Sequence, residues 1–228
     1  FSVVVVAADE EAAATAAQTI EPDAFYADLN SVSPETKIRV GRWIEAAQAR
    51  FVEIAVMSPI APRGIRSPML LGGKHAPAFI ELMQCCDPDM RAISETIGTA
   101  AATKMCRSVM YKGLEALFLE SMLAARRYGV DEAVLTSLAG TFEKGWPETA
   151  RYMVSRTLIH GRRRAEEMRE AAKTVAEAGL EPLVTERIAE REDWAADASA
   201  RLGSLNPVEA SLAELLDALS SRVRTRRG

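Results

Sequence analysis

Residues 94–113 read SETIGTAAATKMCRSVMYKG. A glycine and a run of small residues lead into a long helical pattern, and Lys104 lies near its start. At about 100° per residue the helix has one narrow polar stripe, which consists of Lys104, Ser108, Tyr111 and Glu115. This stripe is either the solvent-facing side of an amphipathic helix or the wall of a ligand site, where a partly desolvated lysine exchanges protons with a substrate.

The composition narrows the class of protein. The chain has 228 residues, of which 48% are hydrophobic and 26% charged, which is enough for one large domain or two small ones. A net charge of -4 argues against nucleic-acid binding, because a phosphate-binding surface needs a basic excess. No apolar run reaches membrane-spanning length, and no basic region precedes the short apolar stretch at the N-terminus. Three cysteines without metal-ligand spacing fit a reducing compartment, so we expect a cytoplasmic protein.

Strand and helix patterns alternate over the first third of the chain. We expect strands at residues 3–6, 24–29, 51–57 and 68–71, and helices at residues 10–18, 34–49 and 76–83. This alternation predicts a parallel sheet with helices on its faces. Ligands gather at the carboxyl ends of strands in such sheets, which here are residues 7–9, 30–33 and 57–66.

Only helical patterns follow residue 96. They cover residues 96–128, 131–142, 147–159, 162–178, 182–202 and 208–223, with glycines and prolines between several of them. The predicted fold class is therefore an α/β partial Rossmann-type parallel sheet followed by an all-α helical domain. We place the α/β domain at residues 1–94 and the helical domain at residues 95–228.

Four motifs in this order resemble those of one enzyme superfamily. Residues 2–9, SVVVVAAD, are similar to its cofactor-contacting strand and loop, and residues 28–34, DLNSVSP, to its Asp-x-Ser-Thr-x-x-Pro. Residues 51–57, FVEIAVM, are similar to the strand before its substrate loop, and residues 98–104 to its glycine-rich turn and catalytic lysine. The chain thus resembles the 3-hydroxyacid dehydrogenase and 6-phosphogluconate dehydrogenase superfamily, in a branch whose C-terminal helical domain is poorly characterised.

The resemblance implies an oxidoreductase that transfers a hydride between NAD or NADP and a small molecule, with Lys104 as proton donor and acceptor. It implies cofactor contacts from Ala7, Ala8, Asp9, Asn30 and Ser31. The candidate substrate-binding residues are Ser58, Arg63, Arg66, Ser108 and His160. Relatives dimerise through the helical domain, which implies a homodimer.

The sequence also departs from the superfamily pattern. The usual Pro-Val-Ser-Gly-Gly of the substrate loop is replaced by AVMSP at residues 55–59, and Ser108 stands where an asparagine is expected. The substrate class therefore stays open. The phosphate-binding Gly-x-Gly-x-x-Gly would precede Phe1, and two missing units would amount to roughly 60 residues. We expect that a beginning is missing and that the chain as given binds a dinucleotide poorly.

Several alternatives remain at this point. Arg63 and Arg66 fit a solvated loop as well as a site for an anionic group. His160 lies in a basic cluster with Arg156 and residues 162–164, whose arginines either pair with Glu166, Glu167 and Glu170 along the helix or reach a ligand. For the whole protein, the alternatives are an imine reductase-like enzyme and a non-enzymatic dimerisation or binding module.

Overall fold

The computed structural model describes residues 9–139, 145–200 and 202–220. The chain forms two compact units, of which the first is Phe1–Val109 with Arg169–Pro182 and the second is Met110–Met168 with Leu183–Gly228. Each unit is discontinuous in sequence, and the domain boundary between residues 94 and 95 stays a prediction. The strand expected at residues 3–6 lies outside the described residues.

The first unit contains a four-stranded sheet. Its strands are β1 (Phe25–Asp28), β2 (Arg50–Val56), β3 (Met69–Gly72) and β4 (Met90–Ser94), in the spatial order β1-β2-β3-β4. The β1–β2 and β3–β4 pairs are parallel, as expected, but β2 and β3 are antiparallel. The prediction of a wholly parallel sheet is wrong at this pair because residues 57–68 contain no crossover helix, only a short 3₁₀ turn at Gly64–Arg66. The short strand β4 was not expected.

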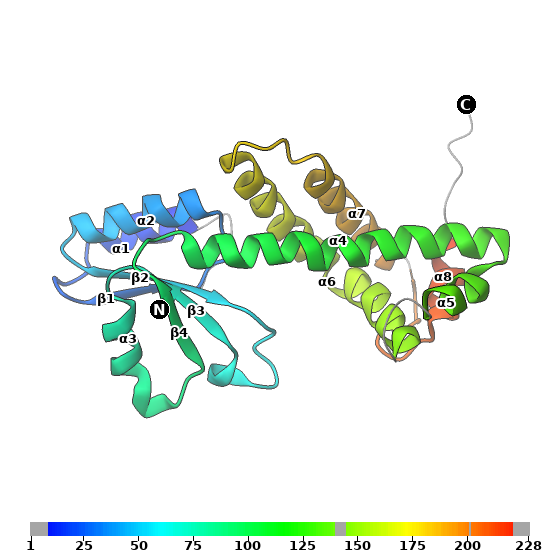
Figure 1. Cartoon of the computed structure of the whole chain (residues 1–228), viewed down its shortest axis with the longest axis horizontal. Helices are drawn as coiled ribbons and strands as arrows, with labels where there is room; N and C mark the ends of the chain where they lie inside the picture. Colours follow the sequence, from blue (N-terminus) through cyan, green and yellow to red (C-terminus); the bar gives the residue numbers. More distant parts are fainter. Residues whose placement is uncertain (1–8, 140–144, 201, 221–228) are drawn as a thin grey trace. The chain divides into compact units, whose positions relative to one another are not determined.

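Helices cover both faces of this sheet. The helices α1 (Asp9–Ala17) and α2 (Pro34–Ala46) lie on one face and α3 (Ala76–Met83) lies on the other (Figure 1). Alternate strand residues point to opposite faces. Tyr26 and Phe51 therefore pack with α2, whereas Ala27 and Val52 belong to the core under α3. The α2 helix begins as expected, with Ser33 at its N-cap and Pro34 in its first turn.

The remaining described elements are helices. They are α4 (Thr99–Tyr128), α5 (Asp131–Ala139), α6 (Trp146–Glu177), α7 (Leu183–Ser199) and α8 (Leu212–Ser220). Two helices were expected at residues 147–159 and 162–178, but α6 is continuous through Gly161. A Cβ atom at Gly161 would lie 2.5 Å from the carbonyl oxygen of Glu192, so this glycine allows close helix packing and does not end the helix.

The second unit has its own hydrophobic core. Side chains from α4, α6, α7 and α8 form it, including Leu119, Met122, Val154, Ala195 and Leu215. This helical core agrees with the expected all-α part of the fold class. Among the residues described, no helix combines the length and the apolar character that crossing a membrane requires.

Candidate functional site

The beginning of α4 is fixed to the sheet through a buried glutamate. Glu53, in the middle of β2, is almost fully buried, and its Oε1 accepts a hydrogen bond from the backbone amide of Ala100 at 2.9 Å. The first amides of a helix lack partners within the helix, so this carboxylate satisfies one of them. A Cβ at Gly72 would lie 2.2 Å from the Glu53 Oε1, so β3 needs glycine at this position.

Lys104 and Ser31, which the sequence placed in one site, lie in contact. Both side chains are half-buried, and the Lys104 Nζ donates a hydrogen bond to the Ser31 Oγ at 2.6 Å. Ser31 follows the carboxyl end of β1, and Lys104 lies in the second turn of α4. Gly98, with a φ of 99°, makes the turn that leads into α4, a backbone conformation that favours glycine. The glycine-led turn therefore brings a lysine to a strand end, where ligands bind in open α/β sheets.

A buried polar network lies beneath the turn that carries Ser31. The Asp28 Oδ1 accepts hydrogen bonds from the backbone amide and the Nδ2 of Asn30, at 2.9 and 2.8 Å. The Asn30 Nδ2 also donates to the Asp9 Oδ1 at 2.6 Å. Lys37 on α2 forms an ion pair with the Asp28 Oδ2 at 2.7 Å, and both side chains are almost fully buried. Asn30 is thus part of the internal structure that holds the turn in place.

Electrostatics in this network make Asp9 easier to protonate than an ordinary aspartate. Burial, followed by the negative charge of Asp28, raises the pKa of Asp9 to about 6. The positive charge of Lys37 and the hydrogen bond from Asn30 act in the opposite direction. Burial also raises the pKa of Glu53, although the backbone hydrogen bond from Ala100 opposes the shift. The region therefore contains more carboxylates than one lysine neutralises.

The other predicted contacts lie at different places in the structure. Ala7 and Ala8 are outside the described residues. Ser108 is half-buried one turn after Lys104, on the same side of α4. His160 belongs to the second unit.

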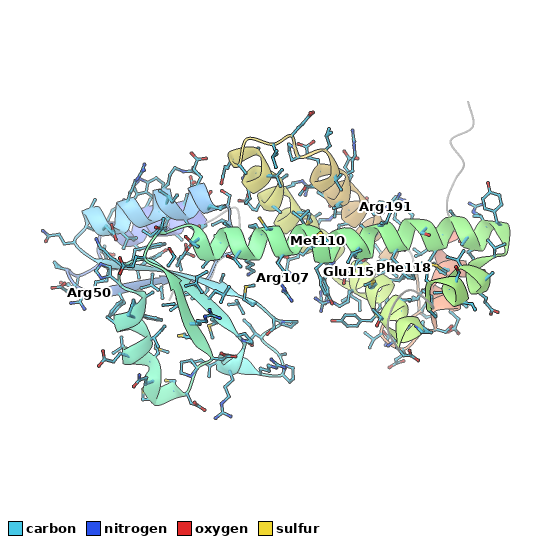
Figure 2. All side chains as sticks on the ribbon, viewed as in Figure 1. Arg50, Arg107, Met110, Glu115, Phe118 and Arg191 are labelled. Carbon is cyan, nitrogen blue, oxygen red and sulfur yellow. The ribbon has the colours of Figure 1, made fainter. Side chains whose placement is uncertain are left out.

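The loop after β2 holds the three remaining candidates. Arg107 on α4 (labelled in Figure 2) contacts the start of this loop, since its Nη1 donates a hydrogen bond to the carbonyl oxygen of Met57 at 3.0 Å. Ser58 is half-buried, and Arg63 is exposed. Arg66 forms an exposed ion pair with Asp87 at 2.8 Å. The substrate-binding roles of Ser58, Arg63 and Arg66 stay predictions.

Two buried residues that support the site, Glu53 and Lys37, were not predicted from the sequence. Glu53 interrupts an otherwise apolar strand, and a charged residue in such a run is a readable signal of a specific buried partner. Lys37 gave no comparable signal, because a lysine at an amphipathic helix position usually faces solvent.

Two glutamates from α6 accept hydrogen bonds from backbone amides at the start of α2. The Glu170 Oε2 accepts a hydrogen bond from the backbone amide of Ser33 at 3.1 Å, and the Glu177 Oε2 from that of Glu35 at 3.2 Å. These carboxylates lie at the positive end of the α2 dipole, where negative charge is stabilising. They help to fix the turn between β1 and α2 that presents Ser31.

The three consecutive arginines of α6 have different partners in the second unit. Arg162 forms exposed ion pairs with Asp193 and Asp197 of α7. Arg163 pairs with Glu167 along the helix, as one of the alternatives predicted. Arg164 is buried and lies between two buried carboxylates, those of Glu115 (labelled in Figure 2) and Glu192. The expectation that the arginines pair along the helix is therefore confirmed only for Arg163, because neighbouring helices supply acids to the other two.

Comparison with known proteins places the chain in a family. Residues 125–194 match a domain of unknown function, DUF1932. An uncharacterized 28.5 kDa protein in the 7S RNA 5' region of Methanothermus fervidus is 30% identical over 160 residues, which make up 70% of this chain. The chain spans 61% of the length of that curated relative.

Two solved structures match most of the chain. A conserved hypothetical protein from Sinorhizobium meliloti 1021 is 36% identical, with a TM-score of 0.79, over 97% of this chain and 74% of that one. The conserved protein MTH1747, whose structure is described as similar to 3-hydroxyacid dehydrogenases, is 31% identical, with a TM-score of 0.70, over 85% of this chain and 74% of that one. The chain therefore belongs to the superfamily of 3-hydroxyacid dehydrogenase-like proteins, in a group with a DUF1932 domain in its helical part.

Proposed function

We propose that the protein is an NAD(P)-dependent oxidoreductase in which Lys104 exchanges a proton with the substrate. The observation that carries the proposal is the 2.6 Å hydrogen bond between the half-buried Lys104 Nζ and the Ser31 Oγ, at the carboxyl end of β1. A lysine held at this edge of the sheet by a hydroxyl group is suited to act on a ligand bound there.

The described residues fit the nicotinamide end of a cofactor better than its phosphates. Ser31 is half-buried and offers a hydroxyl group at the strand end, so it would contact the nicotinamide together with Ala7 and Ala8. Asn30 would act indirectly, since its side chain already donates to Asp9 and Asp28. The sequence contains no Gly-x-Gly-x-x-Gly turn for the pyrophosphate. A bound nicotinamide would supply hydride transfer.

Lys104 would supply the proton that balances this transfer. Reduction of a carbonyl or an imine leaves negative charge on oxygen or nitrogen, which an ammonium group within hydrogen-bond distance neutralises by donating a proton. In the oxidative direction the neutral amine would accept that proton. Ser31 would orient the Lys104 Nζ, and Ser108, one turn further along α4, would orient the substrate. Ser58, Arg63 and Arg66 would hold a substrate's anionic group.

The proposal also includes a homodimer formed through the helical part. Met110, Leu114 and Leu117 are exposed at i, i+4 and i+7 on α4, and the smaller Ser121 and Ala124 continue the same face. If two α4 helices pack antiparallel about a two-fold axis, the large side chains at 110, 114 and 117 of one protomer contact the small side chains at 121 and 124 of the other.

Cofactor titration and a substrate screen on the full-length protein test the proposal. We expect NADH or NADPH fluorescence to change on binding, and one of a set of 3-hydroxy acids, their oxo forms and imines to be turned over. Lys104→Met should lower turnover by about 100-fold or more while cofactor binding is kept. The matched control is Lys74→Met, because the Lys74 side chain is exposed and paired with Glu45.

Two outcomes contradict the proposal, and a third identifies the type of reaction. Equal turnover by Lys104→Met and the wild type would exclude Lys104 as the proton donor. Turnover of imines alone would favour an imine reductase. Binding of neither nucleotide would favour a non-enzymatic module.

A further inference from the structure

Arg156 is a half-buried arginine of α6. Its Nε is buried and has no hydrogen-bond partner among the residues that the structure describes. Its guanidinium group lies 5.7 Å from the centre of the Tyr152 ring, which gives a cation–π contact but no acceptor. A partly desolvated guanidinium without a carboxylate is costly, in contrast to Arg164 and its two glutamates.

His160 lies one turn after Arg156 on the same side of α6. It is half-buried, and its pKa is lowered by burial first and then by the positive charges of Arg156 and Arg163. Glu167 acts in the opposite direction. The imidazole therefore lies in a positive environment that disfavours its own protonation.

The nearby carboxylate does not neutralise this environment. Glu167 is shared, because its Oε2 pairs with the Lys112 Nζ of α4 at 2.5 Å and its Oε1 pairs with Arg163. Glu167 therefore already pairs with two cations, Lys112 and Arg163. Arg156, whose Nε has no hydrogen-bond partner among the described residues, is the cation that an added anion would neutralise.

We propose that Arg156 and His160, with Arg163 on the next turn, form a binding site for an oxyanion, such as a carboxylate or phosphate group. Their i, i+4, i+7 spacing places the three side chains along about 10 Å of one helix face. Arginine offers paired donors that match two oxygens of such a group, and the imidazole adds a third donor. The site lies inside the segment that matches DUF1932, to which no function is assigned.

The site requires neither cofactor nor catalysis. A binding measurement without turnover therefore separates failure of this site from failure of the dehydrogenase proposal.

The experiment follows the two histidine side chains by NMR during pH titrations in chloride, inorganic phosphate or malonate at equal ionic strength. We expect phosphate, malonate or both to raise the pKa of His160 by about 0.5 unit or more, because a bound anion stabilises the imidazolium. His75, in the first unit, should be unaffected and serves as an internal reference. Comparing the two anions distinguishes a phosphate site from a carboxylate site.

Variants test whether Arg156 holds the anion. Arg156→Gln should weaken anion binding at least tenfold, and Arg156→Lys should restore part of it, because the charge returns without the paired donors. Arg191→Gln is the matched control, since the Arg191 guanidinium also lies over an aromatic ring, 5.0 Å from the centre of Trp194. Identical His160 titrations in all three salts, or equal weakening by Arg191→Gln, would overturn the site.

Discussion

Asp28 and Glu53 are partners across the parallel β1–β2 pair, and both carboxylates are almost fully buried on the same face of the sheet. Lys37 pairs directly with Asp28, and its positive charge opposes the rise in the pKa of Glu53 that burial causes. Asp28 accepts a hydrogen bond from the backbone amide of Asn30, in the turn that carries Ser31. Glu53 accepts one from the amide of Ala100, in the first turn of the helix that carries Lys104. The two adjacent strand residues thereby set the positions of both members of the candidate catalytic pair.

Glu53 should affect activity by positioning the start of α4, since its carboxylate accepts a backbone hydrogen bond from Ala100 in the first turn of that helix. Glu53→Ala should lower the free energy of unfolding by about 1–3 kcal/mol, because it leaves the Ala100 amide without its buried acceptor. Glu53→Gln, which keeps an acceptor oxygen, should retain most of the stability and activity. Urea unfolding and kcat measurements check this, and equal losses in both variants would contradict it.

Gly72→Ala, on the neighbouring strand β3, should disturb the same hydrogen bond between Glu53 and the Ala100 amide. The new Cβ would lie 2.2 Å from the Glu53 Oε1, so the carboxylate must move away from Ala100. We expect a loss of about 1–3 kcal/mol in the free energy of unfolding. Combining Gly72→Ala with Glu53→Ala should cost less than the sum of the two single changes, and strict additivity would argue against a shared mechanism.

Asp9 should make stability depend on pH. Its pKa rises from 3.8 to about 6 on folding, so the folded state binds more protons than the unfolded chain between these values. The contribution of Asp9 to the free energy of unfolding therefore falls as the pH rises through this range. Asp9→Asn keeps an acceptor for Asn30 but cannot ionise, so it should gain stability over the wild type as the pH rises from 3.8 to about 6. Chemical unfolding at several pH values measures this difference, and a constant difference would contradict the prediction.

Arg164 should be critical for the stability of the second unit. Arg164→Met leaves Glu115 and Glu192 buried without their cation, which should cost about 3–5 kcal/mol in the free energy of unfolding. The neighbouring Arg162→Met is the matched control and should cost under about 1 kcal/mol, because its ion pairs are exposed. Similar losses in the two variants would show that the buried position of Arg164 has no special role.

Leu117→Glu tests the proposed dimer. Leu117 is 67% exposed on α4, so a charge there should leave the fold intact and raise the dissociation constant of the dimer at least tenfold. Leu82→Glu is the control, since Leu82 is 58% exposed on α3 in the first unit. Sedimentation velocity gives the masses. A monomeric wild type, or an unchanged dimer in the Leu117 variant, would contradict the proposed surface.

Local patterns predicted most helices and strands because each is encoded by neighbouring residues. The N-cap Ser33 with Pro34 and the small-residue turn before Lys104 are signals of this kind. The rule that ligands bind at strand ends and the superfamily resemblance together placed Lys104 and Ser31 in one site, but their direct hydrogen bond was not predicted.

Features that depend on distant residues were not predicted. Gly161 resembles a helix break in sequence, and only the closeness of the Glu192 backbone explains why it lies inside α6. The antiparallel β2–β3 pair depends on the path of a loop, and the burial of Lys37 depends on Asp28 from another element. Such partners are set by tertiary packing, which a single sequence does not reveal.

The stretch Arg169–Pro182 folds with residues that precede it by more than a hundred positions. A gene truncated after Val109 would therefore yield a sheet whose Ser33 and Glu35 amides have lost Glu170 and Glu177. The two units cannot be separated by one cut, and their modular exchange between proteins would require three splice points.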